Sequence, residues 1–264
     1  MPKNAFKRNL LAGNRQLGIW CSLPSSYAAE AVAGCGFDWM LFDTEHSPGD
    51  PLTVLSQLQA VAPYPTSAIV RPASNDSVLI KRYLDIGAQT FLIPFVENAN
   101  DAKAAVSATR YPPNGMRGIS SLTRATGFGR IANYVAHAAE EICVLVQVET
   151  AQALEQINSI AQVEGVDGIF IGSNDLAGSL GFAGDSFHPH VISKIEGAIS
   201  AIRGAQKPAG ILTTNSAFAK QCIDLGCLFP AVAIDIDILV HGSEVALGSL
   251  RSNASLVKAS RWQS

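Results

Sequence analysis

Hydrophobic and polar positions alternate between two kinds of segment along nearly the whole chain. Short apolar runs rich in β-branched residues predict buried strands, and amphipathic runs at helical spacing follow them. The predicted strands comprise residues 17–22, 39–45, 67–72, 90–95, 144–149, 168–175, 209–213 and 229–235. The predicted helices comprise residues 25–34, 54–62, 78–86, 99–109, 151–160, 190–203, 216–225 and 239–250. Eight alternations without a linker predict a single (β/α)8 TIM barrel over residues 1–264, with a doubly wound open sheet as the alternative.

Polar side chains gather at the C-terminal ends of the predicted strands, whereas the strand starts are bland. The residues at these ends are Asp43, Glu45, His46, Arg71, Gln147, Glu149, Asn174, Asp175, Thr213 and Asp235. In a barrel the C-terminal ends of the strands form the rim that carries the chemistry. The asymmetry therefore predicts an enzyme.

Two consecutive predicted strands end in a carboxylate. Residues 143–149 end in Gln147 and Glu149, and residues 168–175 end in Asp175. Glu149 and Asp175 would lie together on one rim, where a divalent cation such as Mg²⁺ or Mn²⁺ could bridge them. The alternative is that Asp175 caps a helix starting at Leu176 and Glu149 caps the helix from Ala151 onward.

His46 and Arg71 are the other candidates for chemistry. His46 follows Asp43 and Glu45 and suits a general base near neutral pH, or it is a loop residue paired with Asp43. Arg71 ends a buried strand and needs an anion there. That anion is either a developing enolate oxygen or simply a neighbouring acid.

Composition narrows the class of protein. Of the 264 residues 48% are hydrophobic and 16% charged, with a net charge of −3, which argues against nucleic acid as a partner. Five scattered cysteines without zinc spacing, a polar start and no bilayer-spanning apolar stretch predict a cytoplasmic protein. No lysine falls within a predicted strand, which argues against a Schiff-base mechanism inside the barrel. The lysines are Lys3, Lys7, Lys81, Lys103, Lys194, Lys207, Lys220 and Lys258.

Five motifs together give the chain a specific resemblance. They are residues 37–46 (FDWMLFDTEH), 70–72 (VRP), 110–118 (RYPPNGMRG), 144–150 (VLVQVET) and 164–176 (EGVDGIFIGSNDL). With them the chain resembles the metal-dependent class II pyruvate aldolases, the family of 4-hydroxy-2-oxoheptanedioate aldolase and 2-dehydro-3-deoxyglucarate aldolase. The resemblance runs over nearly the whole chain.

The resemblance implies an activity and a role for each site residue. The enzyme would reversibly cleave a 4-hydroxy-2-oxoacid to pyruvate and an aldehyde, as in aromatic compound catabolism. Glu149 and Asp175 would hold the metal (Mg²⁺ or Mn²⁺, with Co²⁺ or Zn²⁺ as alternatives). Arg71 would stabilise the pyruvate enolate, and His46 would act as base, oriented by Asp43 or by Asp85. The substrate would contact Gln147, Ser173, Asn174, Asp175, Trp20 and Leu212. The family also implies a homohexamer in which the last helix packs on a neighbouring subunit.

Departures from the family pattern leave the substrate open. Ser173 and Asn174 stand where relatives have a proline and a small residue, Ile234 replaces a small residue, and Thr44 replaces a glycine. The alternatives are a barrel that acts on a 2-keto-3-deoxy sugar acid, one that decarboxylates oxaloacetate, and a non-catalytic 2-oxoacid binder. Intact Asp43, His46 and Arg71 argue against the binder.

Overall fold

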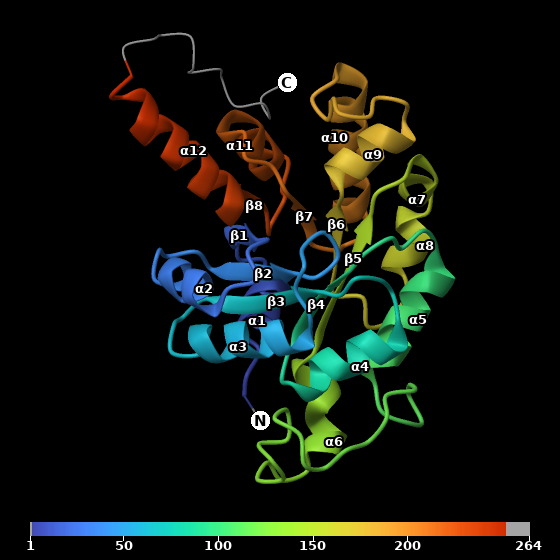
Figure 1. The fold of residues 1–264 in the computed structure, drawn as a ribbon. Coiled ribbons are helices and arrows are strands. Elements are labelled where there is room, and N and C mark those ends of the chain that lie inside the picture. The colour runs from blue at the N-terminus through green and yellow to red at the C-terminus, as the bar shows by residue number, and fades with distance from the viewer. Residues whose placement is uncertain (1, 252–264) are drawn as a thin grey trace.

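A computed structural model describes residues 2–251 of the chain, so Lys258 lies outside the described residues. Eight strands surrounded by helices form a nearly closed barrel, which confirms the predicted TIM-barrel fold (Figure 1). The strands are β1 (Gly18–Cys21), β2 (Trp39–Asp43), β3 (Ser67–Arg71), β4 (Thr90–Ile93), β5 (Cys143–Val148), β6 (Gly168–Ile171), β7 (Ala209–Ile211) and β8 (Ala231–Ile234).

The helices follow the strands in the order expected of βα units. They are α1 (Ala5–Leu11), α2 (Ser26–Ala33), α3 (Pro51–Val61), α4 (Ser77–Asp85), α5 (Ala99–Thr109), α6 (Tyr134–His137), η1 (Ala138–Glu141), α7 (Ala151–Glu155), α8 (Ile157–Ala161), α9 (Ser173–Ser179), α10 (Pro189–Gly204), α11 (Ser216–Asp224) and α12 (Asp235–Gly248). The predicted helix 151–160 is therefore two short helices. The predicted helix 239–250 begins earlier, where the Asp235 carboxylate accepts the Ile236 N–H at 2.7 Å.

All strand pairs are parallel, and strands adjacent in sequence are adjacent in the sheet, in the order β7-β6-β5-β4-β3-β2-β1-β8. Just beyond β7, an isolated bridge joins Leu212 to Ala231 of β8, and the Thr213 N–H donates to the Ala231 carbonyl at 3.0 Å. These contacts close the gap between β7 and β8. The open-sheet alternative is therefore wrong.

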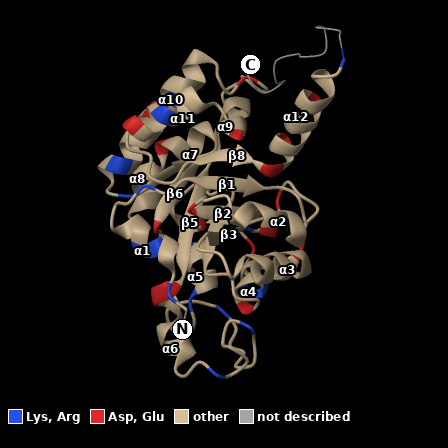
Figure 2. Cartoon of the chain, turned by 90° about the vertical axis from the view of Figure 1, so that its left-hand side faces the viewer, with Lys and Arg blue, Asp and Glu red and all other residues tan. Residues whose placement is uncertain are grey.

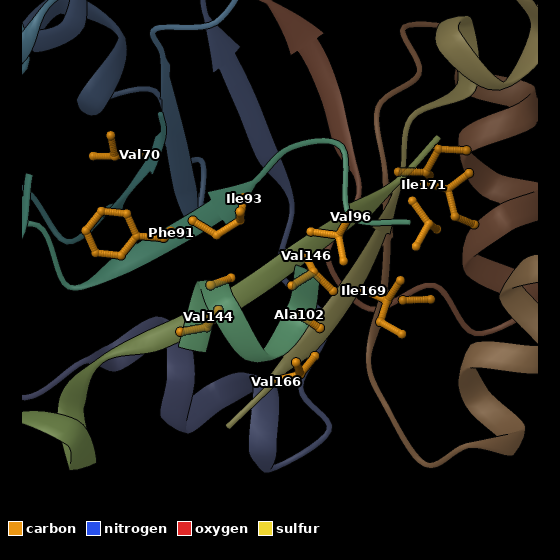
Figure 3. Packing of buried hydrophobic residues seen from close by; sticks show 14 of the residues in the cluster. Val70, Phe91, Ile93, Val96, Ala102, Val144, Val146, Val166, Ile169 and Ile171 are labelled. Carbon is orange, nitrogen blue, oxygen red and sulfur yellow. The ribbon is translucent and has the colours of Figure 1, made fainter. Parts of the chain in front are cut away.

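Two apolar layers hold the barrel, because successive side chains of a strand point to opposite faces. The outward layer includes Val70, Phe91, Val146 and Ile169, and Ala102 of α5 packs against this layer (Figure 3). The inward layer fills the barrel itself. It contains Trp20, Trp39, Leu41, Ile69, Leu92, Cys143, Leu145, Phe170, Phe229 and Ala231, joined by Phe6 and Leu10 of α1.

Helix α1 closes the end of the barrel at which the strands begin. The Phe6 ring packs edge-to-face on Trp39 and Phe229, with centroid distances of 6.2 and 5.9 Å. Asn4 ties the helix start to the first residue of β4, since its amide donates to the Thr90 hydroxyl at 2.9 Å. With this end plugged, the C-terminal ends of the strands form the open mouth.

Helix α12 departs from this compact arrangement. It leaves the end of β8 and runs outward, away from the other helices (Figures 1 and 2). It exposes the apolar side chains Ile236, Ile238, Leu239, Val240, Val245 and Leu247. No described helix is both long enough and apolar enough to cross a membrane.

Candidate active site

Strand β5 delivers two polar side chains to the mouth through its alternation. Cys143 and Leu145 point into the barrel, so Gln147 and Glu149 continue the same inward face one and two steps further. Gln147 is 2% exposed and Glu149 is 3% exposed. A carboxylate and an amide therefore sit in the throat of the barrel, directly above its apolar filling.

Both oxygens of Glu149 are held by hydrogen bonds. The Phe95 N–H donates to Oε1 at 2.7 Å, and the Gln147 amide donates to Oε2 at 2.5 Å. Phe95 takes a left-handed backbone conformation (φ 54°), which is uncommon for a bulky residue. The predicted strand 90–95 therefore stops at Ile93, and the turn that follows aims an amide at Glu149. Backbone strain of this kind concentrates at functional sites.

The environment of Glu149 disfavours its negative charge. Burial raises its pKa to about 7, and the charges of Asp175 and Glu45 add to this effect against the hydrogen bonds from Gln147 and Phe95. The Gln147 Oε1 atom is buried and has no hydrogen-bond partner among the described residues. The throat thus holds a buried amide oxygen without a described donor, beside a buried carboxylate whose negative charge is disfavoured.

Asp175 does not end strand β6, as the sequence had suggested. The strand stops at Ile171, where the Gly172 N–H still donates to Val148 at 3.0 Å, and α9 begins one residue later. Asp175 lies exposed in the first turn of α9. The prediction of a strand over 168–175 is therefore wrong at its C-terminal end, because the motif turns into a helix before the acid.

The two capping alternatives are also wrong. The N-cap of α9 is Gly172, with no side-chain cap, and Asp175 lies inside the helix. The N-cap of α7 is Thr150, whose hydroxyl accepts the Ala153 N–H at 3.0 Å. Neither Glu149 nor Asp175 serves as a helix cap, so both carboxylates remain available for another partner.

Gly172 lets the second acid approach the first. A Cβ added at this residue would lie 2.7 Å from the Glu149 Oε2 atom and 2.9 Å from the Gln147 amide nitrogen. A larger residue would fill the space beside the Glu149 carboxylate. The chain passes this point and places Asp175 three residues later, near enough for its charge to raise the pKa of Glu149.

The donor set fits a hard divalent cation with open positions. Glu149 and Asp175 supply carboxylate oxygens, which Mg²⁺ and Mn²⁺ prefer, and Mg²⁺ is usually bound through one or two carboxylates. Within residues 2–251 no cluster of three or more histidine, cysteine or acidic side chains forms a fuller cage. A cation bound by this pair would leave sites for water and a chelating ligand.

Strands β2 and β3 place a carboxylate and a guanidinium side by side. Asp43 and Arg71 are paired residues in the ladder. The Arg71 Nε and Nη2 atoms donate to the two Asp43 oxygens at 2.9 and 2.7 Å, and both side chains are almost fully buried. Burial alone would raise the pKa of Asp43, but the hydrogen bonds and charge of Arg71 outweigh it and hold that pKa below its ordinary value.

Glu45 and Trp20 complete the surroundings of Arg71. The Glu45 Oε2 atom lies 2.7 Å from Nη1 of Arg71. The guanidinium carbon lies 4.6 Å from the centre of the Trp20 ring, whose indole N–H donates to Asp43 at 3.2 Å. Two of the five guanidinium N–H groups thus donate to the Asp43 carboxylate, whereas the Glu45 contact is an ion pair in which Oε2 accepts no hydrogen bond from a described residue. The remaining N–H groups of Nη1 and Nη2 donate to no described residue and are left for a ligand.

His46 lies at the rim with an exposed side chain. Its Nε2 atom is 4.0 Å from Glu45, and its backbone N–H donates to Asp43 at 3.4 Å. The Asp43 carboxylate therefore accepts hydrogen bonds both from the main chain of His46 and from the Arg71 guanidinium. The nearest carboxylate to the ring is that of Glu45.

Asp85 does not meet His46 within one chain. It is the last residue of α4, which has run back to the strand starts, and its carboxylate lies 3.5 Å from the buried Arg117. A helix that follows a parallel strand ends at the opposite side of the barrel from the mouth. The expectation that Asp85 orients His46 therefore needs correction for a single described chain.

The remaining predicted contact residues lie around the mouth. The Trp20 side chain belongs to the inward layer of the barrel, and Leu212 directly follows β7. The Ser173 hydroxyl donates to the Leu212 carbonyl at 3.5 Å, and Asn174 is exposed beside it. Glu45 and Phe95 are the two residues whose roles the sequence did not indicate. Adjacency to His46 was a signal for Glu45, whereas nothing local marks Phe95.

Comparisons with known proteins place this geometry in context. The family model described as HpcH/HpaI aldolase/citrate lyase matches residues 16–242. A pyruvate aldolase from Rhizobium etli is 61% identical over 244 residues, which are 92% of this chain and 96% of that protein. A 4-hydroxy-2-oxo-heptane-1,7-dioate aldolase from Salmonella heidelberg is 51% identical over 259 residues, 98% of both chains.

A solved structure agrees with these sequence matches. It is the crystal structure of an HpcH/HpaI aldolase/citrate lyase family protein from Burkholderia cenocepacia. The two chains superpose with a TM-score of 0.91 at 37% identity, covering 95% of this chain and 100% of that one. The barrel architecture is therefore shared along the full length of the match.

Proposed function

The chain belongs to the HpcH/HpaI aldolase/citrate lyase family, and we propose that its barrel mouth cleaves a 4-hydroxy-2-oxoacid into pyruvate and an aldehyde. The observation that carries this proposal is the convergence of two charge systems at one mouth. Glu149 and Asp175 place two carboxylates close enough to interact, and Arg71 places a buried cation with N–H groups that Asp43 does not hold. Cleavage of this substrate class needs both.

Glu149 and Asp175 would hold the metal, and the Gln147 amide would contact the 2-oxoacid beside it. A divalent cation there supplies Lewis acidity toward the oxygens of the 2-oxoacid. Trp20, Leu212, Ser173 and Asn174 would line the remainder of the substrate pocket. Ser173 and Asn174 lie in the first turn of α9 at the mouth, so these two residues would influence which aldehyde is accepted.

His46 would perform the proton transfers. It removes the proton of the C4 hydroxyl, the C3–C4 bond breaks, and its electron pair becomes the enolate of pyruvate while C4 leaves as the aldehyde. The negative charge that develops on the enolate oxygen is stabilised by the Arg71 N–H groups that Asp43 does not hold. His46 then returns its proton to C3 and gives pyruvate. Asp43 and Glu45 keep Arg71 fixed through this sequence.

A pyruvate-release assay tests the proposal directly. Wild-type protein with Mg²⁺ or Mn²⁺ should release equimolar pyruvate and aldehyde from 4-hydroxy-2-oxoacids, and chelator should stop the reaction. The panel should include 2-keto-3-deoxy sugar acids and oxaloacetate. Borohydride added with pyruvate should leave no stable adduct, since no described lysine lies in a strand. Pyruvate from oxaloacetate alone would indicate a decarboxylase, and binding without turnover a non-catalytic protein.

The exposed face of α12 bears on assembly. We propose that a second copy of the chain covers this apolar helix in a homohexamer, and that an Asp85 acting on His46 comes from a neighbouring copy. Light scattering should give about six times the chain mass of 27.8 kDa. Leu239→Asp on α12 should lower that mass. Leu52→Asp, at a leucine of α3 that is even more exposed, should not. A monomeric wild type would contradict the proposal.

A further inference from the structure

A directional chain of hydrogen bonds runs from helix α4 to the end of strand β3. The Tyr83 hydroxyl donates to the Thr44 hydroxyl at 3.0 Å, and Thr44 in turn donates to the Arg71 carbonyl at 2.7 Å. The Thr44 N–H donates to the same carbonyl at 3.0 Å. Thr44 therefore makes two bonds to the backbone of Arg71.

This chain is shielded from water along its whole length. Tyr83 is 2% exposed, Thr44 6% and Arg71 5%. Buried hydroxyls that lose their partner cost free energy, so each member favours the arrangement of the next. Water is not at hand to substitute for a missing bond. The three groups are therefore fixed together.

The position of Thr44 connects the chain to the proposed chemistry. Thr44 directly follows Asp43, whose carboxylate holds the Arg71 side chain by two hydrogen bonds. The Asp43–Arg71 pair is thus fixed twice, once through the side chains and once through the backbone by Thr44. A glycine at position 44 would keep the hydrogen bond from its N–H to the Arg71 carbonyl but lose the one from the hydroxyl. It would also leave the Tyr83 hydroxyl without its acceptor.

We propose that Tyr83 and Thr44 are positioning residues that set the Arg71 guanidinium for enolate stabilisation, an inference that rests on the proposed aldolase function. Neither residue touches the substrate. Their contribution is accuracy, because charge stabilisation by fixed donors depends on placement to within a fraction of an ångström. The relay supports the backbone from which the Arg71 side chain extends.

Four variants test the relay, with deuterium exchange at the pyruvate methyl group and cleavage as readouts. Thr44→Val removes the hydroxyl at constant shape, and we expect kcat for both reactions to fall about tenfold. Thr44→Ser keeps the hydroxyl and should stay within about twofold of wild type. Tyr83→Phe should have a smaller effect than Thr44→Val, because the bond to Arg71 survives. In the double variant, Tyr83→Phe should add nothing further.

Two measurements separate positioning from general destabilisation. The affinity for Mn²⁺ and the KM for pyruvate should be unchanged in Thr44→Val, because Glu149, Asp175 and Gln147 remain in place. Tyr111→Phe is the matched control, since it removes a buried tyrosine hydroxyl that has no partner among the described residues. It should leave exchange and cleavage at the wild-type rate.

The outcomes distinguish the relay from the function on which it rests. An active wild type with an unimpaired Thr44→Val variant, measured per folded enzyme, overturns the relay alone. Equal losses in Thr44→Val and Thr44→Ser also overturn it, since the hydroxyl would then not be the important group. A wild type that neither exchanges nor cleaves overturns the relay and the aldolase function together.

Discussion

Arg71→Ala should lower both 4-hydroxy-2-oxoacid cleavage and pyruvate methyl exchange by about a thousandfold. Both reactions pass through the pyruvate enolate, and removal of one fixed donor to such an oxyanion costs about 10²–10³ in rate. Arg71 has more than one N–H group free of hydrogen bonds to described residues, and Asp43 and Glu45 hold its guanidinium in ion pairs. The loss should therefore reach the upper end of that range.

The His46→Ala variant separates the base from the enolate stabiliser. Cleavage should fall about a hundredfold to ten-thousandfold, the usual effect of a lost general base. Methyl exchange should fall as well, because His46 returns its proton to C3 in the proposed sequence, although Arg71 stays in place in this variant. A base that serves only the C4 hydroxyl leaves exchange intact, unlike Arg71→Ala.

The folding of the Arg71→Ala variant must be measured alongside its activity. Arg71→Ala leaves the Asp43 carboxylate buried without its partner, a change that typically costs about 3–5 kcal/mol of stability. Arg71→Lys retains the charge without the two-pronged geometry and should lose rate with a smaller loss of stability. Arg110→Ala removes an arginine paired with Glu164 at 3.2 Å outside the barrel and should be neutral. Cleavage at the wild-type rate in Arg71→Ala would refute the mechanism.

The fold was predictable because each strand carries its own signature. Strands of a covered parallel sheet are buried on both faces, so they appear as short apolar runs regardless of what packs on them. β5 is such a run, and its alternation alone places Gln147 and Glu149 inside. The sequence placed Asp43 and Arg71 at the ends of neighbouring strands, and the structure pairs them in register. Local pattern was sufficient here.

Features that depend on distant partners were not predictable. The Phe95 N–H donates to Glu149, which lies 54 residues later in the chain. The left-handed backbone conformation of Phe95 could not be predicted, because the residue is not a glycine. Asp175 was placed on a strand because an apolar run and a helix start are contiguous in the sequence. Asp85 and His46 lie at opposite ends of the barrel within one chain, which their local sequence does not show. Each of these features depends on contacts that only the closed barrel defines.

Replacing either metal ligand should abolish metal-dependent activity and weaken binding of Mn²⁺ by at least about a hundredfold. Glu149→Gln and Asp175→Asn keep the side-chain size while removing one negative charge each. Manganese binding can be measured by calorimetry in the absence of substrate, so this readout does not depend on turnover. Undiminished affinity in both variants would refute the assignment.

Measuring the stability of the metal-free protein separates a loss of metal binding from a loss of folding. Burial raises the pKa of Glu149 from about 4.5 to about 7, so between these values the folded protein keeps a proton that the unfolded chain releases. Stability from this group is therefore lost as pH rises through that window, and above it the buried carboxylate is a cost. Glu149→Gln removes the cost. At pH 8 this metal-free variant should have a free energy of unfolding about 3 kcal/mol above wild type, with convergence below pH 4.5.

Asp175→Asn is the matched comparison, since Asp175 is exposed in the first turn of α9 and pays no comparable cost of burial. Loss of its charge relieves Glu149 only through their mutual repulsion, so its gain in stability at pH 8 should be clearly smaller. Urea unfolding of both metal-free variants at pH 4.5 and pH 8 measures the difference. We expect both variants to lose manganese binding and only Glu149→Gln to gain stability. That result would show that the mouth stays folded and that its acid pair, suited to a cation, destabilises the metal-free protein. A Glu149→Gln variant less stable than wild type at pH 8 would show instead that the Glu149 carboxylate supports the fold itself.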